Sequence, residues 1–237
     1  MDDVEGEGPA AARNRGAERA RGELLAFTDD DCRPVRGWLR ALAGRWLEDP
    51  AAAIGGRITN GLPGNAFATA SQTIVDLVYA HYNAGAAPRF FASNNLAVPA
   101  EGFREVGGFD ESFRTSEDRE FCDRWLRRGR RLAFAPDALV GHAPSMDLSG
   151  FVQRHFRYGQ GAFRFHRSRS RNVAESVRRE LGFYRSLPSG ARASLAEAGP
   201  RAPALGALLV AWQLANAAGF AWEALEDAAG RAAALVD

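Results

Sequence analysis

The sequence predicts an α/β fold over residues 1–145, a sheet with flanking helices, and a helical extension over residues 146–237. Short apolar runs alternate with segments whose apolar residues recur at helical spacing, up to about residue 142. Such alternation is typical of an α/β sheet. Beyond it the sequence changes to an arginine-rich helical segment, a linker and an apolar tail, so we expect the boundary near residues 144–147.

The composition is that of a folded soluble protein, with 46% hydrophobic and 25% charged residues. The net charge of +1 gives no general attraction to nucleic acid, so no nucleic-acid partner is expected. All 30 basic residues are arginine, because the sequence contains no lysine. This excludes mechanisms that depend on lysine, such as a Walker phosphate loop or a Schiff base.

The cysteines and the N-terminal residues indicate the cellular compartment in which the protein is expected. Cys32 and Cys122 stand apart from any C-x-x-C or His/Cys cluster in the sequence, so neither a zinc site nor a disulfide framework is predicted. Both are expected to be free thiols. Residues 1–14 are acidic, are expected to be flexible and contain no apolar signal region, so a cytoplasmic protein is expected.

The first half of the chain contains two strand patterns and two helix patterns. Residues 23–27 predict a strand, and Pro34 is expected to start a helix, because the apolar residues of VRGWLRALAGRWL recur at helical spacing. Residues 52–58 predict the next strand, which is closed by the turn-rich sequence NGLPGN. Residues 72–82 have the apolar density of a helix.

Three further segments continue the α/β pattern. Residues 89–98 have the pattern of a strand interrupted by a polar pair. Residues 101–113 predict a short helix followed by a turn. Residues 116–128 predict a helix with Ser116 as its N-cap and Gly129 as its stop.

The last strand candidates lead into the extension. Residues 132–135 and 138–140 predict two short strands. Residues 148–171 then predict a helix rich in arginine and aromatic residues, and residues 185–203 a linker.

The C-terminal part suggests contact with a membrane surface. Residues 202–222 carry no charge and could span a bilayer by length, but Gln213 and Asn216 disfavour insertion. Residues 153–179 contain eight arginines and a single acidic residue. A basic segment beside an apolar helix is typical of peripheral contact with an anionic surface. A C-terminal helix packed on the core, with a solvated neighbour, fits the same pattern.

Three consecutive aspartates follow the first predicted strand in FTDDDCRP. Asp29 and Asp31 can point the same way and give two hard oxygen ligands to Mg²⁺ or Mn²⁺. A solvated acidic turn is the alternative, but the apolar strand before the pair favours a ligand site, because ligands bind at the carboxyl ends of strands in open α/β sheets. His142 lies just past the last predicted strand and is either a structural histidine or a further metal ligand.

Glu117 and Asp118 lie in the first turn of the helix predicted over residues 116–128. The helix dipole there favours ionised carboxylates by ~0.3–1 kcal/mol. An ionised, directed carboxylate is what a general base requires. Acidic residues in first turns are also common helix stabilisers, so the pair alone does not assign catalysis.

The motifs occur in the order GPAAARNRGAERARGELLAFTDDDCRP, GWL, FASNNLAV, GGFDESF, SEDREFCDRWLRRG and GH. Their order and spacing resemble family 2 glycosyltransferases with a GT-A, Rossmann-like fold, over about residues 8–165. The resemblance implies transfer of a sugar from a nucleotide-sugar donor to an acceptor hydroxyl with inversion, and a divalent metal, Mn²⁺ or Mg²⁺. It also implies a glycan or lipid-linked acceptor of the cell envelope, met at the inner face of the cell membrane.

The resemblance assigns roles to residues of this chain. The implied metal ligands are Asp29, Asp31 and His142, and the implied catalytic residues are Asp118, the base, and Glu117. The implied substrate-binding residues are Arg13, Asn94, Asn95, Gly107, Gly108 and Asp110. Gln153, Arg157 and Tyr158 only approximate the Q-x-x-R-W signature of processive synthases, so a single transfer is expected.

One departure from the family pattern leaves alternatives open. Family members begin with a strand, a helix and a second strand that cradles the nucleotide base, whereas ARNRG starts here at Ala12, so the sheet is expected to be incomplete. An inactive, truncated remnant or a fragment that depends on a partner is therefore an alternative. A haloacid-dehalogenase-type phosphatase is another, although Arg33 stands where its motif has threonine or valine.

Overall fold

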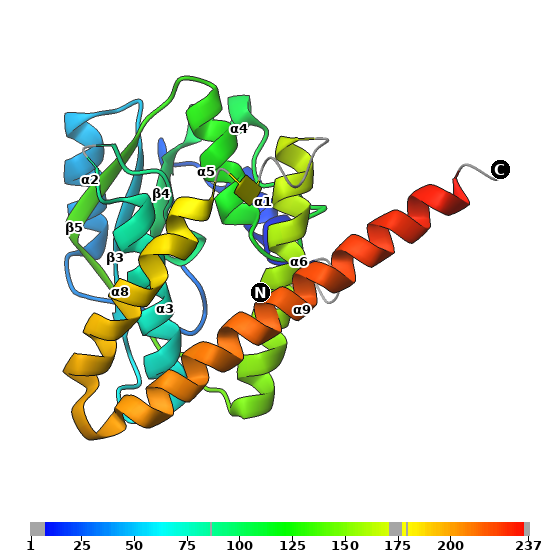
Figure 1. The fold of residues 1–237 in the computed structure, drawn as a ribbon. Coiled ribbons are helices and arrows are strands. Elements are labelled where there is room, and N and C mark those ends of the chain that lie inside the picture. Colours follow the sequence, from blue (N-terminus) through cyan, green and yellow to red (C-terminus); the bar gives the residue numbers. More distant parts are fainter. Residues whose placement is uncertain (1–7, 86, 171–176, 179, 235–237) are drawn as a thin grey trace. The chain divides into compact units, whose positions relative to one another are not determined.

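The computed structural model describes residues 8–85, 87–170, 177–178 and 180–234. The chain divides into two compact units, Met1–Ser145 and Met146–Asp237, whose elements are labelled in Figure 1. The first unit contains, in order, α1 (Gly8–Arg19), β1 (Leu24–Phe27), β2 (Cys32–Pro34), α2 (Trp38–Glu48), β3 (Ala53–Asn60), α3 (Ala66–Tyr82), the 3₁₀ turn η1 (Ser93–Asn95), β4 (Leu96–Pro99), α4 (Ala100–Val106), α5 (Glu117–Arg127) and β5 (Leu132–His142). The predicted α/β class is confirmed.

The five strands form one mixed sheet in the order β1-β4-β3-β5-β2. β3 and β5 run parallel, and the other neighbouring pairs are antiparallel. All four residues of β4 are buried. Its side chains alternate between two covered faces: Leu96 and Val98 join one hydrophobic cluster and Ala97 joins the other.

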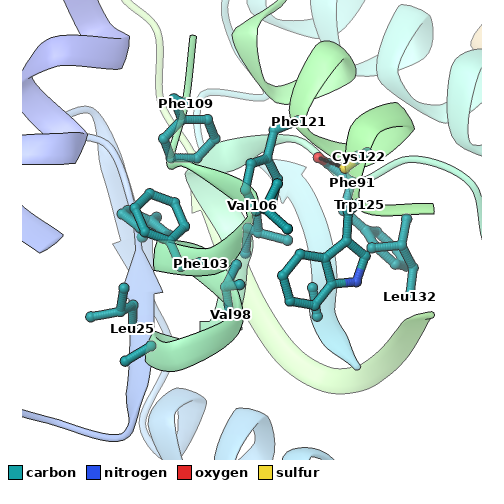
Figure 2. Packing of buried hydrophobic residues seen from close by; sticks show 14 of the residues in the cluster. Leu25, Phe91, Val98, Phe103, Val106, Phe109, Phe121, Cys122, Trp125 and Leu132 are labelled. Carbon is teal, nitrogen blue, oxygen red and sulfur yellow. Dashed lines mark hydrogen bonds between the residues drawn. The ribbon is translucent and has the colours of Figure 1, made fainter. Parts of the chain in front are cut away.

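Helices cover both faces of this sheet. On one face, aromatic residues of α4, α5 and the loop between them pack against β1 and β4, as Figure 2 shows for Phe103, Phe109 and Phe121. The Phe109 and Phe121 ring centroids lie 5.0 Å apart, within the range in which aromatic pairs attract beyond their buried area. On the other face, Trp38 and Leu42 of α2 pack against β3 and β5. The start of α5 is therefore fixed to the sheet by a dense core.

The side chain of Asn95 stabilises a break in the pairing of the parallel strands β3 and β5. The β3–β5 register shifts after Gly56. Asn95 Nδ2 donates to the main-chain carbonyls of Arg57 at 2.9 Å and Ala138 at 2.8 Å. Its Oδ1 accepts from Trp38 Nε1 at 2.8 Å. The fully buried side chain therefore binds the sheet with its donors and helix α2 with its acceptor.

Several expectations about local structure in this unit are wrong. One is the strand expected over residues 89–98, where only Leu96–Pro99 is a strand and Ser93–Asn95 is a 3₁₀ turn. From Gly8 onwards the segment expected to be flexible is helix α1, whose Ala10 is buried in the core. Pro34 ends β2 instead of starting a helix, because residues 32–34 pair with the distant end of β5. The two strand candidates near residue 136 form the single strand β5. Pro136 is tolerated inside it because it lies at the register shift, where its nitrogen does not have to donate a hydrogen bond to the neighbouring strand.

The second unit is helical in its described residues, as predicted for the extension. It contains α6 (Leu148–Arg169), α8 (Leu181–Ala198), the 3₁₀ turn η2 (Gly199–Arg201) and α9 (Ala202–Ala233). The prediction of a linker over residues 185–203 is wrong, because most of this segment belongs to helix α8. Pro188 lies inside that helix.

Two glycines let α6 and α9 pack backbone to backbone. A Cβ added to Gly159 would lie 2.0 Å from the main-chain oxygen of Asn216, and one added to Gly219 would lie 1.9 Å from that of Phe156. Real Cβ atoms do not approach so closely. Any larger residue at either position would therefore force the two helices apart.

Carboxylates neutralise part of the arginine-rich face of α6. The ion pairs are Arg164–Glu223 at 2.6 Å, Arg167–Asp227 at 3.5 Å and Arg169–Glu180 at 3.0 Å. Among the described residues, at least three of the arginines expected to face an anionic surface are thus engaged within the protein.

Replacing Gly219 with alanine is expected to destabilise the second unit by about 1–3 kcal/mol, because the new Cβ overpacks a backbone contact. Gly230→Ala on the same helix is the matched control. Its Cβ would meet nothing within 4 Å, so it should stabilise α9 by up to about 1 kcal/mol. Urea denaturation followed by circular dichroism compares the two, and equal stabilities would contradict the close packing.

Candidate active site

The guanidinium of Arg13 holds two of the predicted site carboxylates. From α1, its Nη2 donates to Asp29 Oδ1 and its Nη1 to Glu117 Oε1, each at 2.6 Å. Asp29 follows β1 and Glu117 begins α5, so the bridge joins three segments of the chain. The distances are those of charge-assisted hydrogen bonds, and the Arg13 side chain is only 14% exposed. Arg13 therefore fixes both carboxylates in place.

Glu117 and Asp118 form an acid pair next to this bridge. Asp118 Oδ2 accepts from the main-chain N–H of Ser93 at 3.2 Å, and its Oδ1 from that of Arg119 at 2.7 Å. Burial and then the charge of Asp118 raise the pKa of Glu117 to about 7, against the opposing effect of Arg13. Burial also raises the pKa of Asp118, again opposed by Arg13. Burial therefore makes both carboxyls of the pair lose their protons at higher pH than ordinary carboxyls do.

The chain turns sharply into α5 at Ser116. Ser116 occupies the N-cap position, as predicted, but its side chain makes no capping hydrogen bond and its φ is 65°. Positive φ is uncommon for residues other than glycine and is tolerated where the surrounding structure enforces it. Here the turn precedes the two acidic residues that face Arg13 and Ser93.

Asp31 and His142 meet where β2 pairs with β5. His142 Nε2 lies 3.3 Å from Asp31 Oδ2. The Cys32 thiol donates to Asp31 Oδ1 at 3.7 Å, and burial raises the pKa of this thiol to about 11. One ligand atom from each of the three residues lies within 4.8 Å of the others. A carboxylate and an imidazole this close fit a divalent ion, whereas Asp29, the other predicted ligand, is turned to Arg13.

The two adjacent asparagines have different surroundings. Asn94 is 7% exposed, and its Oδ1 has no hydrogen-bond partner among the described residues. It directly follows Ser93, whose N–H binds Asp118. Asn95 does not fit its predicted role in substrate binding, because its side chain is fully buried and hydrogen-bonded to the sheet and to Trp38 of α2.

The loop after α4 is held from two sides. Gly107 and Gly108 have φ values of 91° and 66°, and Asp110 Oδ1 accepts from the N–H and hydroxyl of Ser112 at 3.0 and 2.7 Å. Arg124 of α5 donates to the carbonyl of Gly108 at 2.9 Å. The contact of this loop with a substrate stays a prediction.

Asn14 positions the loop that follows α4. Nothing in the sequence predicts this role, apart from the place of Asn14 in ARNRG. Its Nδ2 donates to the carbonyl of Phe109 at 2.8 Å, and its Oδ1 accepts from the Phe109 N–H at 2.9 Å. A Cβ on Gly108 would lie 2.7 Å from that Oδ1. Asn14 thus ties the loop after α4 to the helix that carries Arg13.

Comparison with known proteins adds a family and a fold. The profile of glycosyl transferase family 2 matches residues 3–107. Pre-mycofactocin glycosyltransferase of Mycobacterium tuberculosis is 33% identical over 160 residues, 65% of this chain and 34% of that protein. Glycosyltransferase AglE of Haloferax volcanii is 28% identical over 158 residues, 66% of this chain and 51% of that protein. The chain therefore spans about a third to a half of the curated relatives it matches.

A solved structure shares the fold. The mannosyltransferase PcManGT from Pyrobaculum calidifontis, solved in complex with GDP-Man and Mn²⁺, superposes with a TM-score of 0.60 at 22% identity. The match covers 94% of this chain and 69% of the other. The predicted GT-A fold is thereby confirmed. The sequence of residues 3–107 thus matches glycosyl transferase family 2, and the chain has the fold of a solved glycosyltransferase.

Proposed function

We propose that this protein transfers a sugar from a nucleotide-sugar donor to an acceptor hydroxyl, once per encounter and with inversion of the anomeric carbon. The observation that carries the proposal is the cluster around Arg13, which holds Asp29 on one side and Glu117 on the other. Both curated relatives named above are glycosyltransferases. A phosphatase of the haloacid-dehalogenase type has no support from these matches.

Asp118 is the proposed general base, with Glu117 as its partner. Displacement at an anomeric carbon needs the acceptor hydroxyl to lose its proton as it attacks. Both Asp118 oxygens accept main-chain N–H groups, from Ser93 and Arg119, which fixes the direction of the carboxylate. Glu117 is engaged by Arg13 at 2.6 Å, so Asp118 is better placed to receive a proton.

Asp31 and His142 are the proposed ligands of a divalent ion, with Asp29 joining them if Arg13 releases it. Such an ion, when bound, supplies Lewis-acid stabilisation of the departing nucleoside diphosphate. The Mn²⁺ in the Pyrobaculum complex makes Mn²⁺ the first ion to test, and Mg²⁺ the second. We retain Arg13, Asn94, Gly107, Gly108 and Asp110 as proposed substrate-binding residues. The unpartnered, buried Oδ1 of Asn94 is the best supported among the described residues.

Release of nucleoside diphosphate from a panel of nucleotide-sugars tests this function. GDP-mannose is the first donor to try, because the Pyrobaculum protein binds it. Turnover with Mn²⁺ that stops with EDTA supports a metal-dependent transferase. If no donor binds or reacts with either ion, the chain is an inactive or partner-dependent fragment and the proposal is wrong.

The rate of transfer is expected to rise with pH above the usual carboxyl range, because burial raises the pKa of both Asp118 and Glu117 and the base must be ionised. Glu117→Gln removes the neighbouring negative charge, so the acidic limb of the pH–rate profile should move to lower pH. Asp123→Asn on the same helix is the control and should leave the limb in place. A profile that does not change in Glu117→Gln would contradict the coupling of the two carboxyls.

We also propose that the protein works in the cytoplasm on a glycan or lipid-linked acceptor of the cell envelope, at the inner face of the membrane. By length and composition, one stretch over Leu181–Ala233 could cross a membrane, a test that core helices of soluble proteins also pass. α9 exposes Val210, Leu214, Trp222 and Leu225. Since three arginines of α6 are paired with carboxylates, we expect the apolar residues to carry most of the contact.

Leu214→Glu is therefore expected to reduce co-sedimentation with anionic vesicles. Leu47→Glu is the matched control, because Leu47 is 70% exposed in the first unit and Leu214 is 67% exposed in α9. Equal loss in both variants, or no vesicle binding by the unchanged protein, would argue for a purely soluble role of α9.

A further inference from the structure

The pairing of β2 with β5 places three different metal-binding groups together. Cys32 stands directly opposite His142 in the antiparallel register. Residues directly opposite one another project from the same face of a sheet, with Cβ atoms about 4.5–5.5 Å apart. Asp31 precedes Cys32, and its carbonyl accepts from the N–H of Ala143 at 2.8 Å, which continues the pairing past the end of the strands. The three groups are thus positioned by the main chain.

The three side chains lie close to the spacing that a four-coordinate ion requires, with one ligand atom of each within 4.8 Å of the others. Ligand atoms about 2.0–2.3 Å from a tetrahedral ion lie roughly 3.3–3.6 Å from one another. His142 Nε2 lies 3.3 Å from Asp31 Oδ2, and Cys32 Sγ lies 3.7 Å from Asp31 Oδ1. The Asp31 and His142 side chains are 32% and 17% exposed, so an ion can reach them from solvent.

We propose that Asp31, Cys32 and His142 form a three-ligand site that takes Zn²⁺ ahead of Mn²⁺ or Mg²⁺. Carboxylate and water ligands suit Mg²⁺ and Mn²⁺, whereas a thiolate adds a soft ligand that selects zinc-like ions. Three protein ligands leave the fourth position open, as in catalytic zinc sites. Cys32 gives up its proton to solvent when the metal binds.

Asp29 is not needed for this site. Its Oδ1 is held by Arg13 at 2.6 Å, whereas the three proposed zinc ligands already lie within 4.8 Å of one another. The site therefore differs from a D-x-D pair, which depends on Asp29 as well as Asp31. The proposal shares Asp31 and His142 with the proposed transferase, so bound zinc would exclude Mn²⁺ and Cys32 would decide which ion the site prefers.

Metal binding by the complete chain, without nucleotide and in a thiol-free phosphine reductant, tests the proposal. Co²⁺ is the spectroscopic probe, because a thiolate ligand gives a charge-transfer band in the near ultraviolet. The unchanged protein should show this band at one equivalent of Co²⁺, and Zn²⁺ should abolish it. A competing chromophoric chelator then gives the Zn²⁺ dissociation constant of each variant.

Cys32→Ser should lose the band and bind Zn²⁺ at least ~100-fold more weakly. Removing a residue that only supports a metal ligand can already lower the metal affinity ~100-fold, so removing a ligand itself should cost at least as much. Its binding of Mn²⁺ should change little, so the preference for Zn²⁺ falls. Asp30→Asn is the matched control, because Asp30 is exposed and belongs to the same aspartate run. It should keep both the band and the affinity, and so should Asp29→Asn.

Other outcomes overturn the proposal. A band that persists in Cys32→Ser would come from Cys122, and the absence of any band would mean that the thiol does not bind. A loss of Zn²⁺ affinity in Asp29→Asn equal to that in Cys32→Ser would mean that the ion sits on the D-x-D pair. Because no donor sugar is present, these results do not depend on transferase activity, and failure to turn over a nucleotide-sugar would leave them unaffected.

Discussion

Asp118→Asn is expected to lower the rate of sugar transfer by about 10²–10⁴-fold, the contribution typical of a general base. Asparagine keeps the shape of the side chain and can still accept from the Ser93 N–H, which lies 3.2 Å from Asp118 Oδ2. It cannot take a proton from an acceptor hydroxyl. Nucleoside diphosphate release with a working donor and acceptor gives the rate, and thermal unfolding checks that the fold is intact.

The melting temperature of Asp118→Asn should change little, because removing a buried carboxylate offsets the loss of one of the two main-chain hydrogen bonds that its oxygens accept. Asp123→Asn on the same helix is the control for charge and should keep its activity. An Asp118→Asn variant that retains most of its activity would move the base to Glu117 or outside the pair. A variant that loses activity together with its fold would assign Asp118 a structural role.

Arg13→Met is expected to cost about 3 kcal/mol of folding stability at pH 7 to 8. Removing one partner of a buried ion pair typically costs ~3–5 kcal/mol, because the remaining charge is left unpaired. We expect the lower end of this energy range because only one of the two carboxylates is well buried. The Glu117 side chain is 7% exposed, whereas that of Asp29 is 33% exposed. Urea denaturation measures the loss, with Glu18→Gln, an exposed change on the same helix, as the control.

The loss in Arg13→Met should depend on pH in a defined direction. Arg13 lowers the pKa of Glu117, so without it that pKa rises further above its value in the unfolded chain. A carboxyl whose pKa is raised by folding favours the folded state at low pH and loses that contribution as pH rises through the folded pKa. The difference between Arg13→Met and the unchanged protein should therefore be smaller near pH 5 than near pH 8.

A double variant tests whether Arg13 stabilises the fold through its ion pair with Glu117 or through packing. Arg13→Met combined with Glu117→Gln removes both sides of one ion pair, so it should be more stable than the sum of the two single changes predicts. Strict additivity, or a destabilisation that is independent of pH, would mean that Arg13 stabilises the fold through packing rather than through charge.

The sequence by itself determined the fold class and the chemistry of the site residues. Alternation of strand and helix patterns up to about residue 142 is a local property, as is an apolar strand followed by Asp29 and Asp31. The start of α5 at Glu117 also agrees with a local helix signal. These features depend on neighbours within a few residues, so they can be read before any distant contact is known.

Only the tertiary structure decided which side chains meet. The Arg13 bridge joins residues up to 104 positions apart, and the opposition of Cys32 to His142 depends on the register of β2 against β5. A slip of one residue would turn either side chain to the other face of the sheet. The structural role of Asn95 also depends on distant residues, because a register shift between β3 and β5 leaves two carbonyls that its side-chain amide binds.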